Sequence, residues 1–119
     1  MYNEKVLKEF MKPQNVGTIE DANATAEVGS PQCGDMTKLY LKIENRTITD
    51  AKFQTFGCAA AIATSSAGTR LLKGKSIDEA EKITNKDIIE ELGGLPSAKI
   101  HCSVMFEEVM KEALRNFKK

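Results

Sequence analysis

The chain has 119 residues, a length that suits one domain with a modest hydrophobic core. Its 17 basic and 17 acidic side chains cancel to a formal net charge of zero, which argues against binding to nucleic acid or to an anionic membrane. The longest apolar run, residues 58–63, is too short to span a membrane, and the first residues lack the apolar core of a signal peptide. We therefore expect one domain over residues 1–119, located in the cytoplasm, where three cysteines favour metal binding, thiol chemistry or burial over a disulfide framework.

The N-terminal segment predicts a short amphipathic helix. Apolar side chains recur at helical spacing over residues 2–12, and Pro13 ends the pattern. Val6, Leu7, Phe10 and Met11 lie on one face of this helix, and we expect the helix to dock on the body of the protein.

The following segments predict a small antiparallel sheet. Residues 14–30 are rich in Asn, Gly, Thr and acidic residues, a composition typical of a loop, and we expect one short strand there over residues 24–28. Apolar and polar side chains then alternate over 38–44, and a second strand follows over 47–56 after a tight turn. We expect a hairpin with Cys33 before it and Cys58 after it.

The second half of the chain predicts helices. Small apolar residues from Cys58 onward indicate a close-packed helix that Gly74 ends, and two shorter helices are predicted over 77–83 and 85–93. A final helix, opened by Pro96, has a broad apolar face. Strands followed by helices indicate an α+β fold, in which helices cover a small antiparallel sheet of about three strands.

The three cysteines fall in three different local settings. Cys33 and Cys58 lie beside glycines, which let the backbone approach a bulky ligand, and Cys58 and Cys102 fall near predicted helix starts, where the helix dipole favours thiolate. Asp35 lies two residues after Cys33, and His101 adjoins Cys102. Three thiolates and one harder donor can hold an iron–sulfur cluster without holding it permanently.

Each of these residues also has an interpretation without metal. A lone cysteine is more often a small buried hydrophobe than a ligand, Asp35 suits a turn, and a single histidine such as His101 is usually structural or exposed. The cysteine spacing contains no Cys-x-x-Cys pair, so zinc ribbons, thioredoxin-like motifs and ferredoxin runs fit poorly. The metal hypothesis therefore requires the fold to bring three distant segments to one end of the sheet.

The segments around the cysteines are the most distinctive parts of the sequence. They read Gly29-Ser30-Pro31-Gln32-Cys33-Gly34-Asp35, Phe53-Gln54-Thr55-Phe56-Gly57-Cys58-Ala59-Ala60-Ala61-Ile62-Ala63, and Lys99-Ile100-His101-Cys102-Ser103. Together with residues 2–6, 15–17 and 73–80, they resemble the IscU family of iron–sulfur scaffold proteins, which includes the N-terminal domain of NifU. The resemblance covers nearly the whole chain.

The resemblance implies a cargo and a set of partners. Cys33, Cys58 and Cys102 would hold a nascent [2Fe-2S] cluster, with Asp35 and His101 at the same site as ligand or assembly residues. A PLP-dependent cysteine desulfurase would pass persulfide sulfur to Cys58 or Cys102, iron would be added, and apo iron–sulfur proteins would receive the cluster. Such a chain is a scaffold and not an enzyme, and a homodimer is left open.

One partner motif of the family is incomplete in this chain. The resemblance implies recognition by an Hsp70-type chaperone through a Leu-Pro-Pro-Val-Lys stretch, of which this chain keeps Leu95, Pro96 and Lys99. Ser97 and Ala98 replace the second proline, which orders the peptide in advance, and the valine, which fills a pocket. The substitutions predict weaker docking of such a chaperone.

Two other functions would use the same side chains. Three sulfurs and one oxygen or nitrogen also suit tetrahedral zinc, so a zinc-binding structural or regulatory domain is an alternative, and a cluster-free scaffold can itself take up zinc. A third interpretation is a sulfurtransferase-like thiol enzyme in which His101 activates Cys102. Metal analysis and a test for turnover without iron separate these functions.

Overall fold

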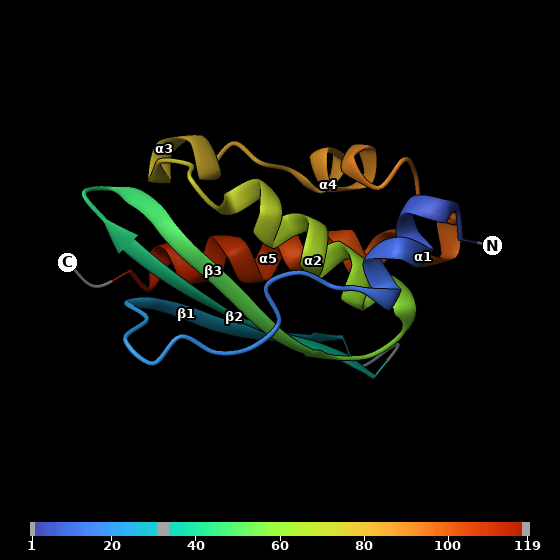
Figure 1. The fold of residues 1–119 in the computed structure, drawn as a ribbon, viewed down its shortest axis with the longest axis horizontal. Helices are drawn as coiled ribbons and strands as arrows, with labels where there is room; N and C mark the ends of the chain where they lie inside the picture. The colour runs from blue at the N-terminus through green and yellow to red at the C-terminus, as the bar shows by residue number, and fades with distance from the viewer. Residues whose placement is uncertain (1, 31–33, 118–119) are drawn as a thin grey trace.

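The structure, a computed structural model, describes residues 2–30 and 34–117. One helix precedes three strands, and the remaining helices follow them (Figure 1). This arrangement confirms the predicted α+β class. Within the described part of the chain, every helix is too short or too polar to span a bilayer.

Three strands form one antiparallel sheet in the order β1–β2–β3. They are β1 (Ala24–Ser30), β2 (Asp35–Glu44) and β3 (Thr47–Phe56). The predicted hairpin is confirmed, and its turn residues Asn45 and Arg46 have φ angles of +52° and +60°, the region that a two-residue type I′ turn uses. Because β2 begins before residue 38, Asp35 lies in the strand, and its interpretation as a turn residue is wrong.

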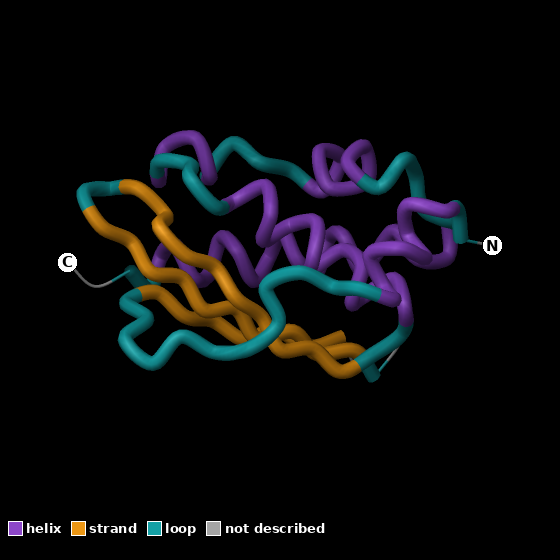
Figure 2. Tube along the Cα trace, in the orientation of Figure 1, coloured by secondary structure: helices purple, strands orange, loops and turns teal. Residues whose placement is uncertain are grey.

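Alternating burial along β2 gives the sheet a covered face and a more open one. Leu39, Leu41 and Ile43 are buried, whereas Lys38 and Tyr40 on the other face are half-buried. The helices lie on the covered side (Figure 2). The alternation of apolar and polar residues along β2 therefore places its apolar side chains on the face that the helices cover.

Two long helices cover the sheet. α2 (Ala59–Leu72) packs on β3, and α5 (Ile100–Arg115) packs on β1 and β2 (Figure 1). α2 consists largely of small residues, and the ring of Phe106 in α5 occupies the space that a side chain at Gly68 would need. The close-packed helix predicted from Cys58 is confirmed, with Cys58 as its N-cap residue.

Three short elements connect or precede the long helices: α3 (Ile77–Ala80), α4 (Asn85–Glu91) and the 3₁₀-helix η1 (Ser97–Lys99). The predicted capping box between Ser76 and Glu79 is confirmed, although the helix is shorter than the predicted range 77–83. Thr84, and not Asn85, is the N-cap of α4: its backbone is extended, and its N–H donates to Asp87 Oδ2 at 2.9 Å. η1 replaces the predicted first turn of the last helix, which begins at Ile100.

α1 (Glu4–Met11) docks through one buried apolar residue and several polar contacts. The predicted docking on the body is confirmed: Val6 is buried in the core, whereas Leu7, Phe10 and Met11 of the same face are exposed by 44, 40 and 77%. Asn3 fixes the start of the helix, because its Oδ1 accepts the Val6 N–H at 2.9 Å while its Nδ2 donates to the Leu92 carbonyl at 3.0 Å.

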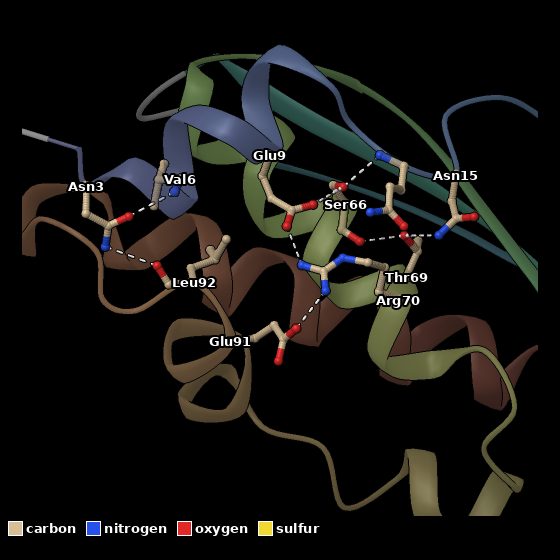
Figure 3. A network of polar contacts seen from close by, with 10 residues as sticks. Asn3, Val6, Glu9, Asn15, Ser66, Thr69, Arg70, Glu91 and Leu92 are labelled. Carbon is tan, nitrogen blue, oxygen red and sulfur yellow. Dashed lines mark hydrogen bonds and ion pairs between the residues drawn. The ribbon is translucent and has the colours of Figure 1, made fainter.

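A network of charged side chains ties α1 and α4 to α2 (Figure 3). The Arg70 guanidinium of α2 binds Glu9 of α1 and, at 2.6 Å, Glu91 of α4. Ser66 Oγ donates to Glu9 Oε1 at 2.6 Å and accepts the Gln14 N–H at 2.8 Å. We call Glu9, Ser66, Arg70 and Glu91 the Arg70 clamp. It links the three helices by ion pairs and hydrogen bonds, in addition to the apolar contacts that Val6 and Ile88 make in the core.

Candidate metal centre

Four segments meet at the end of the sheet opposite the β2–β3 turn. β2 begins there at Asp35, β3 ends at Phe56, α2 begins after Cys58, and Cys102 lies in the first turn of α5. The register pairs Met36 with Phe56, so the start of β2 lies beside the end of β3. The fold thus brings distant segments together, as the metal hypothesis requires.

Two thiols and one carboxylate converge at this end. The sulfur atoms of Cys58 and Cys102 are 3.8 Å apart, and Asp35 Oδ2 lies 3.7 Å from the first and 3.5 Å from the second. All three ligand atoms lie within 4.8 Å of one another. Because zinc binds thiolates at about 2.3 Å and carboxylates at about 2.1 Å, one cation can contact all three after small side-chain movements.

The carboxylate of Asp35 is enclosed, with only 1% of its side chain exposed. Its Oδ1 accepts the backbone N–H of Cys58 at 3.2 Å, and its Oδ2 lies 3.9 Å from His101 Nε2. A buried carboxylate is costly unless hydrogen bonds or a cation compensate it. These contacts are long, so the site favours a cation close to Oδ2.

The two cysteines of the site differ in accessibility. Cys58 is half-buried at the N-cap of α2. Cys102 is fully buried, and this burial, reinforced by Cys58 and then by Asp35, raises the pKa of its thiol far above the ordinary value. The prediction that a helix start favours thiolate at Cys102 is therefore wrong for the metal-free protein. A cation that binds Cys102 must displace a proton, so metal affinity should rise with pH.

His101 and Cys33 complete the set of residues predicted for the site. His101 Nε2 lies 3.6 Å from Cys102 Sγ, which places the imidazole at the edge of the thiol–carboxylate group. Cys33 lies outside the described residues, so its part in the site stays a prediction. Asp35, two residues later in the chain, is already inside the site.

Met105 and Tyr2 belong to the apolar wall of the site and were not predicted there. Two alanines of α2 and Met105 pack with Cys102 in a small buried cluster, against which the ring of Tyr2 lies. Burial and then the charge of Cys58 raise the pKa of the Tyr2 hydroxyl. Met105 follows Cys102 by one helical turn, which could have predicted its position, whereas nothing local in the sequence places Tyr2 there.

The residues predicted for chaperone docking lie next to this site along the chain. Leu95, Pro96 and Lys99 belong to the connection that enters α5 through η1, and all three are half-buried. Leu95 packs against both apolar clusters of the protein. A partner bound to this connection would lie close to the segment that carries Cys102, and the recognition itself stays a prediction.

The chain is similar to known proteins over nearly its whole length. The model of the family described as NifU-like N terminal domain matches residues 1–119. The iron-sulfur cluster assembly scaffold protein IscU 1 of Archaeoglobus fulgidus is 50% identical over 117 residues, which cover 98% of this chain and 76% of that protein. The nitrogen fixation protein NifU of Trichormus azollae is 50% identical over 125 residues, which cover 98% of this chain but 42% of that protein.

A solved structure shares the fold at lower identity. FiSufU of Fervidobacterium islandicum AW-1, a protein assigned to the SUF system, superposes with a TM-score of 0.79. The superposition covers 95% of this chain and 96% of that chain at 23% sequence identity. The arrangement of sheet and helices is thus one that known proteins adopt.

Proposed function

The chain belongs to the family of NifU-like N-terminal domains, and we propose that it is a scaffold on which a [2Fe-2S] cluster is assembled before transfer to apo-proteins. The observation that carries the proposal is the convergence of Cys58, Cys102 and Asp35 within 4.8 Å at an end of the sheet. The family model spans residues 1–119, which supports one scaffold domain over that range.

The donor set suits a cargo that has to leave again. Thiolates are the usual ligands of iron–sulfur clusters, whereas a carboxylate is a hard ligand that binds such a cluster less firmly. We propose that Cys33, Cys58 and Cys102 supply the thiolates and that Asp35 supplies the weaker bond, with His101 able to replace it. A site with one weak ligand releases its cargo more readily than a site with four cysteines.

Sulfur would reach the site as a persulfide from a PLP-dependent cysteine desulfurase. The thiolate of Cys58 or Cys102 attacks the outer sulfur of the desulfurase persulfide, the sulfur–sulfur bond breaks, and the desulfurase cysteine leaves as thiolate. Cys58 is half-buried and open to such an approach, whereas Cys102 has to become exposed first. The chain turns nothing over in this step, so it acts as a carrier and not as an enzyme.

Anaerobic reconstitution tests the proposal directly. The protein is incubated with a cysteine desulfurase, L-cysteine, ferrous iron and a reductant, and visible absorption, iron and acid-labile sulfide are measured. We expect iron and sulfide in equal amounts and their subsequent transfer to an apo-ferredoxin. Cys58→Ser and Cys102→Ser should lose the cluster, while Met11→Ser, at a residue of α1 that is 77% exposed, should assemble it normally. Absence of any cluster in the parent protein under these conditions would overturn the proposal.

Zinc separates this proposal from the alternative of a structural zinc domain. Two thiols and a carboxylate also suit tetrahedral zinc, so zinc in the purified protein alone does not decide between the two. The zinc-loaded protein should exchange its metal for a cluster when desulfurase, cysteine and iron are supplied. Retention of zinc, together with unfolding on chelation, would identify a structural zinc site.

A further inference from the structure

Gly57 lies opposite Asp35 where the β2–β3 ladder ends. Met36 pairs with Phe56 in the last rung of that ladder, so the residues just outside this pair, Asp35 and Gly57, face each other. Gly57 has a φ angle of +154°, a conformation that residues with a side chain rarely adopt.

The space beside the Gly57 backbone is filled by the Asp35 side chain. A Cβ atom built on Gly57 would lie 2.7 Å from Asp35 Cγ and 3.1 Å from Asp35 Cβ, and closer still to Oδ1. From the sequence, a glycine beside Cys58 is expected to make room for a bulky ligand. In the structure the room beside this glycine is taken by a carboxylate of the protein itself.

The position of this carboxylate decides whether it can act at the site. Oδ1 reaches the Cys58 N–H at 3.2 Å only while the group lies against Gly57, and the same placement holds Oδ2 at 3.7 and 3.5 Å from the two sulfurs. A side chain at position 57 would push the carboxylate away from the amide, and both contacts to sulfur would lengthen.

We infer that Gly57 is a positioning residue, whose missing side chain lets the Asp35 carboxylate take its place between Cys58 and Cys102. The inference rests on the proposed function, because it assigns Gly57 a role through the metal-binding carboxylate. The loop around Gly57 therefore determines how firmly the Asp35 carboxylate binds the cluster.

Cobalt(II) is the probe that tests this role, because its visible spectrum reports the ligand set of a tetrahedral site without any sulfur transfer. Gly57→Ala should weaken cobalt binding about tenfold, within the range seen when groups that orient a ligand are removed. It should also shift the visible bands in the same direction as Asp35→Ala. Gly74→Ala is the matched control, because Gly74 has a φ of +86° and a Cβ there meets no described atom within 4 Å. This control should lose some stability and keep the parent cobalt spectrum.

A double-mutant cycle separates positioning from general disturbance. In an Asp35→Ala background the clash with the carboxylate is gone, so Gly57→Ala should change cobalt affinity by less than about twofold. An equal loss in both backgrounds would overturn the inference, because Gly57 would then act through the backbone alone. If Gly57→Ala fails to fold, recovery of folding in the double variant supports the inference, and failure to recover overturns it.

The proposed function can fail separately from this inference. If Cys58→Ser and Cys102→Ser bind cobalt with the parent spectrum, the site itself is wrong. If these variants lose cobalt but desulfurase and iron never build a cluster on the parent protein, the scaffold function is wrong. In that second case the cobalt cycle still decides the role of Gly57.

Discussion

The Arg70 clamp and the metal centre both contain carboxylates that are partly or fully buried, but the negative charge is compensated differently in the two groups. In the clamp, Glu9 and Glu91 share one guanidinium, which binds both through short charge-assisted hydrogen bonds. In the metal centre, Asp35 lies among thiols at 3.5 and 3.7 Å, which are weak hydrogen-bond partners. A network of short ion pairs serves stability, whereas a network of long contacts is ready to accept a cation.

Removal of a sulfur ligand should produce the largest effect and leave the clamp intact. Cys102→Ala should reduce cobalt affinity by at least about 100-fold, since a direct ligand contributes no less than the groups that orient it. Thermal unfolding of the metal-free protein should change little, because a small apolar side chain replaces a buried thiol that bears no charge. Titration with cobalt and circular dichroism measure both effects. Parent-like cobalt binding would break the assignment of the metal centre.

Loss of the Arg70 guanidinium should lower the stability of the protein and leave cobalt binding unchanged, the reverse of the effect of Cys102→Ala. Arg70→Met keeps much of the stem but leaves Glu9 and Glu91 without their cation, and we expect a loss of about 2 kcal/mol in the free energy of unfolding. The Arg70 side chain is 25% exposed, so this figure is below that of a fully buried pair. The cobalt spectrum should stay unchanged. Denaturant unfolding checks the stability, and an altered cobalt spectrum would show that the two regions are coupled.

Gly68 tests a contact that is separate from both polar groups. A Cβ at this position would lie 2.6 Å from Phe106 Cζ, so Gly68→Ala should force α2 and α5 apart and lower stability by about 1–3 kcal/mol. Because α2 and α5 carry the two cysteines of the metal centre, we also expect weaker cobalt binding than in the parent. Phe106→Leu combined with Gly68→Ala should recover part of the stability, and no recovery would contradict a steric cause.

Glu107 should give the smallest effect, with a defined dependence on pH. The hydrogen bond from Lys111, assisted by the backbone N–H of Asn85, lowers the pKa of Glu107, although partial burial opposes this change. A carboxyl whose pKa is lower in the folded state stabilises the protein above its unfolded value of about 4.3, and this stabilisation is lost as the pH falls below that value. Glu107→Gln should therefore cost about 0.5–1 kcal/mol at pH 7 and progressively less below pH 4.3. Denaturant unfolding at several pH values measures this, and a cost that stays constant with pH would exclude the ionic contribution.

Local sequence patterns predicted the elements better than their contacts. The hairpin, the helix after Cys58 and the capping box at Ser76 depend on neighbouring residues, and each was found where predicted. The docking of α1 was predicted, but the pattern did not show that Val6 is buried while Leu7 and Met11 are exposed. Nor did it predict that Glu9 binds Arg70, because a helical pattern carries no information about a partner that is distant in sequence.

By itself, the sequence determined the order of strands and helices, the two faces of the hairpin, and the residue types that can bind a soft metal. These properties follow from side-chain periodicity and donor chemistry, which act over a few residues. The tertiary structure alone decided that Cys58 and Cys102 lie 3.8 Å apart, that burial keeps Cys102 protonated in the absence of metal, and that Gly57 makes room for Asp35. Distances and solvation depend on how separate elements pack, and no local pattern along the chain encodes them.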